Sequence, residues 1–332
     1  MSGGRSRRFD PVVETTPGSS GGSTGGSTAD KRLRAAWLYY NRGLTQKEVA
    51  DRLGISRATV IRMLEEAQRR AEVRVWISEP PGESVQLALR LEAAYGLAEA
   101  RVVPGGDRVF ETVGLALGAF LSERLADGMT VGVGWGRTLD AALAGFLPGP
   151  RRDMRVLSLL GGVIQPGTIN PADFAWRLAS ATSATCHLFL APLLVDSADT
   201  RSRLIDCCGL GRIFDLARGM DLAVISCGDP RGRDGSLASN FIDAEVRREL
   251  VAAGAIADVL CQFIDAEGRT LPHPMRDRLM AVDLDCVATA RQVVVATGGA
   301  ERAAALAAAL RRFPGAVLIT DEAAGRRLLE LA

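Results

Sequence analysis

Residues 44–64 read LTQKEVADRLGISRATVIRML, and this stretch decides how the N-terminal part of the chain folds. Thr45, with Glu48 three residues later, has the pattern of a capping box at the start of a helix. Ser56 can cap a second helix. Gly54 lies shortly before it, where a left-handed backbone conformation costs glycine little. The stretch therefore predicts two short helices joined by a tight turn.

The apolar residues of this stretch fall on one side of both predicted helices. They are Val49, Ala50, Leu53, Ile55, Val60 and Leu64. The opposite side of the second helix is small, polar and basic, which is the arrangement of a helix-turn-helix whose second helix enters the major groove of DNA. A structural helical hairpin is the alternative, but it gives no common reason for the caps, the turn glycine and the basic face.

We expect DNA contacts from both helices and from the end of the second one. The predicted residues are Thr45, Gln46, Lys47, Ser56, Arg57, Ala58, Thr59, Arg62 and Arg69. Arg57, flanked by Ser56 and Thr59, is best placed to read base edges, because an arginine fork matches guanine. The other basic residues, together with Arg42, are expected to contact phosphates and so fix orientation.

Charge is unevenly distributed along the chain. The 332 residues carry a net charge of +1, but residues 1–78 hold 14 Lys or Arg against 8 Asp or Glu. The remaining 254 residues hold 26 and 31. A basic head on an acidic body fits a chain whose first part alone meets nucleic-acid phosphates. The only lysines are Lys31 and Lys47, so the larger part cannot form a lysine Schiff base.

Composition narrows the class of protein further. No apolar run is long enough to span a bilayer and the N-terminus has no apolar signal core, which predicts a soluble, cytoplasmic protein without membrane contacts. Six cysteines lack CxxC spacing and only two histidines are present, so we expect reduced thiols, no metal site and no cofactor. The adjacent Cys186 and His187 are expected inside a strand.

The order of patterns predicts four segments. Residues 1–29 are rich in Gly, Ser and Thr and predict a disordered tail. Residues 30–78 form the helix-turn-helix domain, opened by an amphipathic helix from Asp30 to about Arg42 and closed by a strand-like alternation over 73–77. Residues 79–97 form a hinge and a linker helix, and residues 98–332 form one effector domain. The first helix is expected to bury Leu33, Ala36, Trp37 and Tyr40.

From about residue 97 short apolar strands alternate with helices, which predicts an α/β, Rossmann-like parallel sheet covered on both faces. The expected strands are 99–103, 129–134, 155–160, 185–190, 221–226, 257–263, 291–296 and 315–319. The expected helices are 108–126, 137–146, 172–182, 242–253, 300–312 and 321–330. In such sheets ligands bind at the carboxyl ends of strands, where the next helix offers free N–H groups.

Two strand-to-helix junctions are rich in glycine and carry an arginine, and together they favour an anionic, phosphorylated ligand. The predicted effector-binding residues are Gly134, Trp135, Gly136, Arg137 and Thr138 at the first junction, and Gly298, Gly299 and Arg302 at the second. Asp321 follows a third strand. Gln262 and Asp265 could meet sugar hydroxyls, although the sequence DAEG is also a good turn. Neither junction is a Walker loop or a dinucleotide fingerprint.

Several segments, in the same order along the chain, resemble the SorC family of bacterial sugar-responsive transcriptional regulators. They include AAWLYYNRGLTQKEVADRLGISRATVIRMLEEA (35–67), VGVGWGRTLDAAL (131–143), APLLVDSADTRSRLID (191–206), ADVLCQFIDAEGRTLPHPMRDR (257–278), VVVATGGAERAAAL (293–306) and VLITDEAAGRRLL (317–329). The resemblance implies a C-terminal domain with the fold of sugar-phosphate isomerases and deaminases but without their catalytic equipment. It also implies an oligomer whose affinity for its DNA operator changes when a sugar, polyol or sugar phosphate binds.

By position, the resemblance puts a phosphate or hydroxyl end of the effector at residues 134–138. It makes Gly298, Gly299 and Arg302 the opposing wall, with Asp321 nearby. Two departures matter. Position 302, commonly lysine in the family, is arginine here, which keeps the charge but changes its geometry. Position 262, often arginine, is glutamine here, which disfavours a doubly phosphorylated effector.

We therefore expect a transcriptional regulator of a carbohydrate or polyol catabolic operon, acting as a homo-oligomer on a double-stranded, pseudo-palindromic operator. The alternative is a sugar-phosphate isomerase or deaminase with an accessory DNA-binding head. An enzyme of that kind needs a general base near the sugar carbon. The candidates are Asp140, Asp265, Glu267, Asp321 and Glu322, and we expect none of them to be catalytic.

Overall fold

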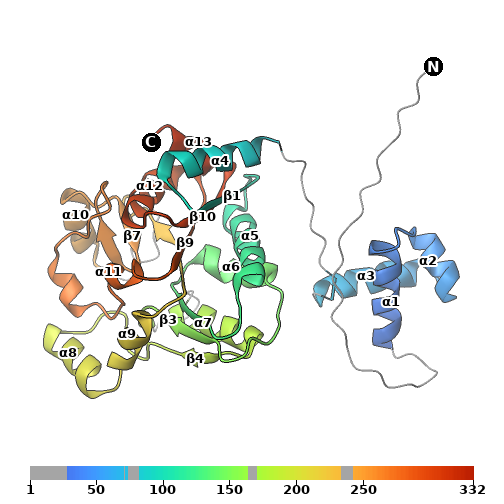
Figure 1. The fold of residues 1–332 in the computed structure, drawn as a ribbon, viewed down its shortest axis with the longest axis horizontal. Helices are drawn as coiled ribbons and strands as arrows, with labels where there is room; N and C mark the ends of the chain where they lie inside the picture. Colours follow the sequence, from blue (N-terminus) through green and yellow to red (C-terminus); the bar gives the residue numbers. More distant parts are fainter. Residues whose placement is uncertain (1–27, 71, 74–81, 164–169, 233–241) are drawn as a thin grey trace. The chain divides into compact units, whose positions relative to one another are not determined.

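The computed structural model describes residues 28–70, 72–73, 82–163, 170–232 and 242–332 (Figure 1). The chain divides into two compact units, Met1–Pro80 and Pro81–Ala332. The predicted tail lies outside the described residues up to position 27, and Thr28 and Ala29 already belong to the first helix. Most of the predicted strand 73–77 and the predicted hinge around 79–81 also lie outside them.

The smaller unit consists of three helices: α1 (Thr28–Tyr40), α2 (Gln46–Leu53) and α3 (Arg57–Arg69). Thr45 and Glu48 form the predicted capping box at the start of α2. Gly54 ends that helix with φ 65° and ψ 34°, the left-handed conformation expected of it. Ser56 caps α3 by accepting a hydrogen bond from the Thr59 N–H. The local signals of the helix-turn-helix are therefore confirmed.

The buried face of α1 differs from the predicted one. Trp37 is 36% exposed and Leu33 is 46% exposed, whereas Arg32, Ala35, Ala36 and Leu38 are buried. Arg32 forms a part-buried ion pair with Glu72, beyond the end of α3, and this pair keeps the Arg32 side of the helix turned inward. Arg42 covers the exposed Trp37 ring instead, with its Cζ 4.7 Å from the ring centroid. Because residues 33–40 are mostly apolar, their sequence does not determine which face of the helix is buried.

The larger unit is built on seven parallel strands in the order β1-β10-β9-β5-β2-β3-β4. Their bounds are β1 Glu99–Val103, β2 Thr130–Val133, β3 Arg155–Ser158, β4 Thr185–His187, β5 Leu222–Ile225, β9 Gln292–Ala296 and β10 Val317–Asp321. Each lies in or near a predicted strand, so the parallel sheet is confirmed. Cys186 and His187 lie in the edge strand β4, as expected, but half-buried.

Helices cover both faces of this sheet (Figure 1). They are α4 Glu83–Tyr95, α5 Val109–Arg124, α6 Arg137–Gly145, α7 Pro171–Thr182, α8 Ala198–Cys207, α9 Gly211–Ala217, α10 Ala244–Ala252, α11 Leu284–Val287, α12 Ala303–Arg312 and α13 Glu322–Leu329, with the short 3-10 helices η2 Pro274–Arg278 and η3 Ala300–Arg302. Alternate residues of one strand enter different cores. Val294 and Ala296 pack with α5 and α6, whereas Val293 and Val295 pack in the other core.

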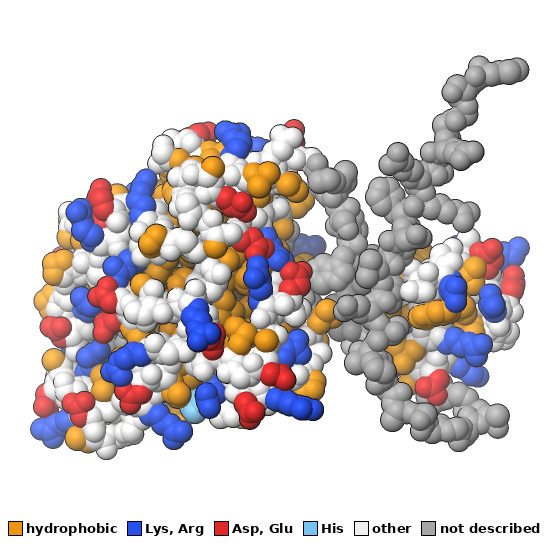
Figure 2. All heavy atoms as spheres, viewed as in Figure 1, with side chains coloured by type: hydrophobic (Ala, Val, Ile, Leu, Met, Phe, Trp, Pro, Cys, Tyr) orange, Lys and Arg blue, Asp and Glu red, His pale blue; other side chains and the backbone are white. Residues whose placement is uncertain are grey.

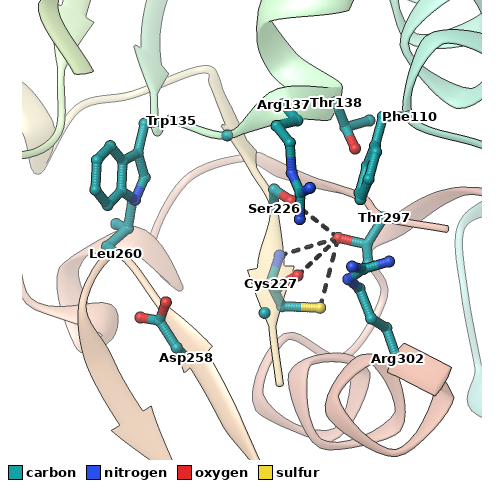
Figure 3. A pocket seen from close by; sticks show the side chains of 12 residues that line it. Phe110, Trp135, Arg137, Thr138, Ser226, Cys227, Asp258, Leu260, Thr297 and Arg302 are labelled. Carbon is teal, nitrogen blue, oxygen red and sulfur yellow. Dashed lines mark hydrogen bonds between the residues drawn. The ribbon is translucent and has the colours of Figure 1, made fainter. Parts of the chain in front are cut away.

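A second, antiparallel sheet was not predicted. The apolar run 257–263 is not one strand but two, β7 (Ala257–Val259) and β8 (Gln262–Ile264), and β6 (Cys227–Gly228) pairs with β7. The chain reverses at Leu260 and Cys261, whose φ values are 52° and 60°. These residue types rarely form such a turn, so this reversal could not be predicted from the local sequence. The hairpin matters because it brings Asp258 and Leu260 over the ends of the parallel strands (Figure 3).

The surface of the larger unit mixes both signs of charge. Figure 2 shows blue and red side chains spread over the visible face, with apolar side chains between them. None of the helices in the described part of the chain is long and apolar enough to cross a membrane.

Candidate functional site

A pocket lies beyond the carboxyl ends of β2, β5 and β9, which are neighbours in the parallel sheet. The segments that follow these strands supply most of its walls. The lining residues are Phe110, Trp135, Gly136, Arg137, Thr138, Ser226, Cys227, Gly228, Asp258, Leu260, Thr297 and Arg302. The position is the one that a parallel sheet offers to ligands, because strand ends and helix starts meet there.

The first glycine-rich junction forms one wall of the pocket as predicted. Gly136 precedes α6 with φ 138°, a backbone conformation that residues with a side chain rarely adopt. Arg137 and Thr138 open the helix, so the N-terminus of α6 faces the pocket, which favours an anion there. Gly134 stands behind this wall, where its N–H donates to Val224 O at 2.8 Å and ties β2 to β5.

The floor of the pocket is a hydrogen-bond network centred on Thr297. Its hydroxyl lies 3.0 Å from the Ser226 hydroxyl and accepts from the Cys227 N–H at 3.0 Å. The Thr320 hydroxyl donates to Thr297 O at 2.7 Å. The ends of β5, β9 and β10 are thus held in fixed positions. Burial raises the pKa of the Cys227 thiol to about 12, so this sulfur stays protonated and is a poor nucleophile.

Two arginine side chains give the pocket a cationic end. Arg137 comes from α6, and Arg302 comes from η3 and is only 6% exposed. Arg302 donates to Gly298 O at 3.1 Å and forms an ion pair with Glu301. Figure 3 shows both guanidinium groups beside the ring of Phe110, close to Thr297. A guanidinium group presents paired N–H donors that match phosphate or carboxylate oxygens.

Asp258 gives the pocket an acidic end, close to Leu260 and Trp135 (Figure 3). It lies in β7 and is only 5% exposed. A carboxylate accepts hydrogen bonds, so this end can bind hydroxyl groups. Asp258 was not predicted as a site residue, although a charged residue within a buried apolar strand is an available signal. Phe110 was also missed, and nothing in its local sequence indicates its role.

The second glycine-rich junction reaches the pocket only through Thr297 and Arg302. Asp321 is fully buried, and its two carboxylate oxygens accept from the Gly299 N–H at 2.7 Å and the Ala323 N–H at 3.0 Å. A Cβ at Gly298 would lie 2.8 Å from Asp321 Oδ1. None of these three residues lines the pocket. They shape the loop that carries Arg302, and their expected contact with the effector stays a prediction.

Gln262 and Asp265 have structural partners away from the pocket. The buried Gln262 amide donates to Val282 O at 2.9 Å and accepts from the Leu284 N–H at 3.3 Å. Asp265 accepts from the Arg269 side chain and backbone in the turn after β8. Burial would raise the pKa of Asp265, but the hydrogen bonds from Arg269 outweigh it and lower that pKa. The turn interpretation of DAEG therefore holds, and the expected contacts with sugar hydroxyls do not fit this placement.

The predicted DNA-contacting residues all belong to α2, α3 and the residues that cap them. Gln46 and Thr59 are half-buried, and the other seven are exposed. The Arg57 Nε donates to Gln46 Oε1 at 3.2 Å, so the two helices present these side chains side by side. The hydroxyls of Thr45 and Ser56 are engaged in helix capping. Arg62 and Arg69 lie further along α3.

Comparisons with known proteins cover both units. A family model described as "Putative sugar-binding domain" matches residues 79–330, and a homeodomain-like model matches residues 27–72. The erythritol catabolism regulatory protein EryD of Brucella abortus is 30% identical over 90% of this chain and 95% of its own length. The sorbitol operon regulator of Klebsiella pneumoniae is 26% identical over 90% of this chain and 97% of its own length.

Solved structures agree on the fold. The full-length sorbitol operon regulator SorC from Klebsiella pneumoniae superposes with a TM-score of 0.70 over 91% of this chain and 100% of that one, at 24% identity. A helix-turn-helix unit followed by a parallel-sheet unit with a ligand pocket at its strand ends defines a DNA-binding regulator with a sugar-binding domain. With these matches, the chain belongs to the SorC family of sugar-responsive transcriptional regulators.

Proposed function

We propose that this chain binds an operator through α2 and α3, and that a phosphorylated sugar or polyol in the pocket changes its affinity for that DNA. The observation that carries the proposal is the pair of arginines, Arg137 and Arg302, beside the N-terminus of α6. Asp258, at the other end, would accept hydrogen bonds from hydroxyls of the same ligand. The names of the relatives support a carbohydrate or polyol catabolic operon as the target.

The DNA side of the proposal rests on exposed side chains. Arg57 would read base edges, while Lys47, Arg62 and Arg69 would contact phosphates. A single unit of this size offers few base contacts, so we propose a homo-oligomer on a pseudo-palindromic operator with half-sites about one helical turn, or a multiple, apart. We propose boundaries of 30–78 for the DNA-binding domain and 98–332 for the effector domain; the matching family models cover 27–72 and 79–330, so the second model also includes the linker helix.

The contacts of α4 suggest how the pocket could influence the DNA-binding domain. Helix α4 is the first described element after the linker, and its first turn is bound to α13. The Ser84 hydroxyl donates to Glu322 at 2.7 Å, and Arg326 lies 3.1 Å from Glu83. Helix α13 begins directly after Asp321, which also holds the Gly299 loop. A ligand that binds the two states unequally could shift α4 through this connection, which an effector must do to change DNA affinity.

We propose that the pocket binds its ligand without chemical turnover. None of the five candidate general bases lines the pocket, and each has a partner elsewhere: Asp140 pairs with Arg177 at 2.6 Å, Asp265 and Glu267 pair with Arg269, Glu322 pairs with Arg326, and Asp321 accepts from two backbone N–H groups. Only Asp258 supplies a carboxylate to the pocket lining among the described residues. Incubation with pentose and hexose phosphates should therefore leave them unchanged.

The proposal is tested by two linked measurements. A thermal-shift screen of tetritols, pentitols, hexitols and their phosphates should show stabilisation by a phosphorylated compound. The same compound should change the affinity of the protein for its own upstream DNA in fluorescence anisotropy. Arg137→Ala should abolish both effects, whereas Arg177→Ala, which removes a surface arginine that pairs with Asp140 outside the pocket, should preserve them. No preference for the upstream DNA over scrambled duplex, with any compound, would contradict the proposal.

A further inference from the structure

Phe110 contacts both arginines of the pocket. The Cζ of Arg137 lies 4.0 Å from the centroid of its ring, and the Cζ of Arg302 lies 4.6 Å from it. We infer that Phe110 is a positioning residue that holds the two guanidinium groups together as a clamp for an anion. This role rests on the proposed effector site. It means that a residue outside the two glycine-rich junctions sets the relative position of the arginines that they supply.

Close packing fixes Phe110 relative to Arg137. Phe110 lies in the first turn of α5, and Arg137 is the first residue of α6. These two helices touch almost backbone to backbone: a Cβ at Gly118 would lie 2.0 Å from Ala142 O, and one at Gly145 would lie 2.3 Å from Leu115 O. Larger residues would push the helices apart. The distance between the ring and Arg137 is therefore set by the helix pair and not by a mobile loop.

The same turn of α5 is packed against the loop that carries Arg302. A Cβ at Gly298 would lie 2.5 Å from the Cγ1 atom of Val109, which is the residue before Phe110. Arg302 itself donates to Gly298 O, which anchors its guanidinium group on that loop. Phe110 thus stands at the point where α5, α6 and the Gly298–Arg302 loop meet. The start of α6 supplies one of its arginine contacts and the Gly298–Arg302 loop supplies the other.

The ring stabilises an arrangement in which two cations lie close together. The two Cζ atoms can be no further apart than the sum of their 4.0 Å and 4.6 Å distances to one centroid, so the two guanidinium groups repel each other, and the pairing of Arg302 with Glu301 offsets part of that repulsion. The negative face of an aromatic ring attracts each of them, and a flat guanidinium group can stack where an ammonium group cannot. An anion bound between them would remove the remaining repulsion.

A second ring in the same helix shows a different use of this motif. Phe120 contacts Arg101 and Arg124 at 4.8 Å and 5.2 Å. There Arg101 pairs with Glu99 and Glu123, and Arg124 also pairs with Glu99, so this ring and its arginines belong to an ion-pair network outside the pocket. Phe120 does not line the pocket. It therefore provides a matched control: a ring with two arginines in α5, away from the proposed ligand.

The test compares Phe110→Leu, Phe110→Tyr and Phe120→Leu in the full chain, with inorganic phosphate as the probe. Phosphate binding is measured by calorimetry and by tryptophan fluorescence, since Trp135 lines the pocket. Phe110→Leu should weaken phosphate binding about 5- to 30-fold, the range expected for losing two cation–ring contacts. Phe110→Tyr should stay within about 2-fold, because it retains the ring. Phe120→Leu should bind phosphate like the wild type.

Labelling of arginines by phenylglyoxal, without ligand, provides a second readout of position. Phe110→Leu should raise the labelling of Arg137, while Phe110→Tyr should not. If the wild type binds phosphate and Phe110→Leu binds it equally well, the role of Phe110 is overturned and the proposed effector site stands. If the wild type binds neither phosphate nor any sugar phosphate, the effector site itself fails, and the role of Phe110 fails with it.

Discussion

Asp321 should be one of the most sensitive positions of the larger unit, although it does not line the pocket. Its carboxylate is fully buried and accepts two backbone hydrogen bonds, from Gly299 at 2.7 Å and from Ala323 at 3.0 Å. The first bond fixes the loop that carries Arg302. The second caps α13, which packs on α4. Asp321→Ala would leave the buried Gly299 N–H without that acceptor and would remove the cap of α13.

The expected cost follows from the two lost bonds. A buried donor left without a partner costs about 1–3 kcal/mol and a lost helix cap about 1 kcal/mol, so Asp321→Ala should lower the free energy of unfolding by about 2–4 kcal/mol. Asp321→Asn retains an oxygen for one N–H group and places an amide against the other, so it should cost about 1–2 kcal/mol. Asparagine is a good N-cap, and α13 should therefore keep its cap while the Gly299 loop loosens.

Urea unfolding of the full chain, followed by tryptophan fluorescence, measures these differences. Ser197→Ala is the control, because the Ser197 hydroxyl is bonded to the N–H and the hydroxyl of Thr200, within the first turn of α8. It should cost about 1 kcal/mol, the usual value for a lost cap. If Asp321→Ala costs no more than Ser197→Ala, the bond to Gly299 contributes nothing and the account of this loop is wrong.

Three further outcomes are expected. Arg57→Ala should reduce the preference for operator over random DNA about 10-fold or more in competition binding, and an unchanged preference would exclude it from base reading. Hydrogen bonds from Arg32 lower the pKa of Glu72 below its ordinary 4.5, so this carboxylate stabilises the smaller unit above pH 4.5 and loses that effect as the pH falls below it. Helix loss on acidification, followed by circular dichroism, should therefore be shallower in Glu72→Gln, and identical curves would show that the pair with Arg32 has no effect. Iodoacetamide should label the exposed Cys207 and Cys208 and spare the buried Cys227, whose pKa is about 12, whereas equally fast labelling of Cys227 in the native protein would contradict its burial.

The features predicted correctly from the sequence are those whose causes lie within a few residues. A capping box, a turn glycine and a helix cap each depend on residues within about four positions of one another. All three occur in the structure as expected. Arg137 and Thr138 were placed at the pocket for a related reason. They follow an apolar strand directly, so the strand end and the helix start fix them together.

The errors have long-range causes. The face of α1 is set by Arg32, whose partner Glu72 lies 40 residues away. The reversal at Leu260 and Cys261 lacks the residues that usually form turns, so packing of the hairpin against the sheet must stabilise it. Asp321 lies at the end of a strand, as ligand-binding residues often do. Both of its carboxylate oxygens, however, already accept hydrogen bonds from backbone N–H groups.

Both short-range and long-range causes position the residues of the pocket, and this explains why only some of them were predicted. Its cations come from local sequence, after β2 and after β9. Their common contact, Phe110, comes from the start of another helix, and its position depends on glycines at 118 and 145 that let α5 and α6 touch. Asp258 lies in a hairpin that the local sequence does not predict. A glycine-rich junction thus locates the charges of such a site, but the spacing between those charges is decided by packing between helices. Because the spacing determines which anion fits, sequences that share the junctions need not share an effector.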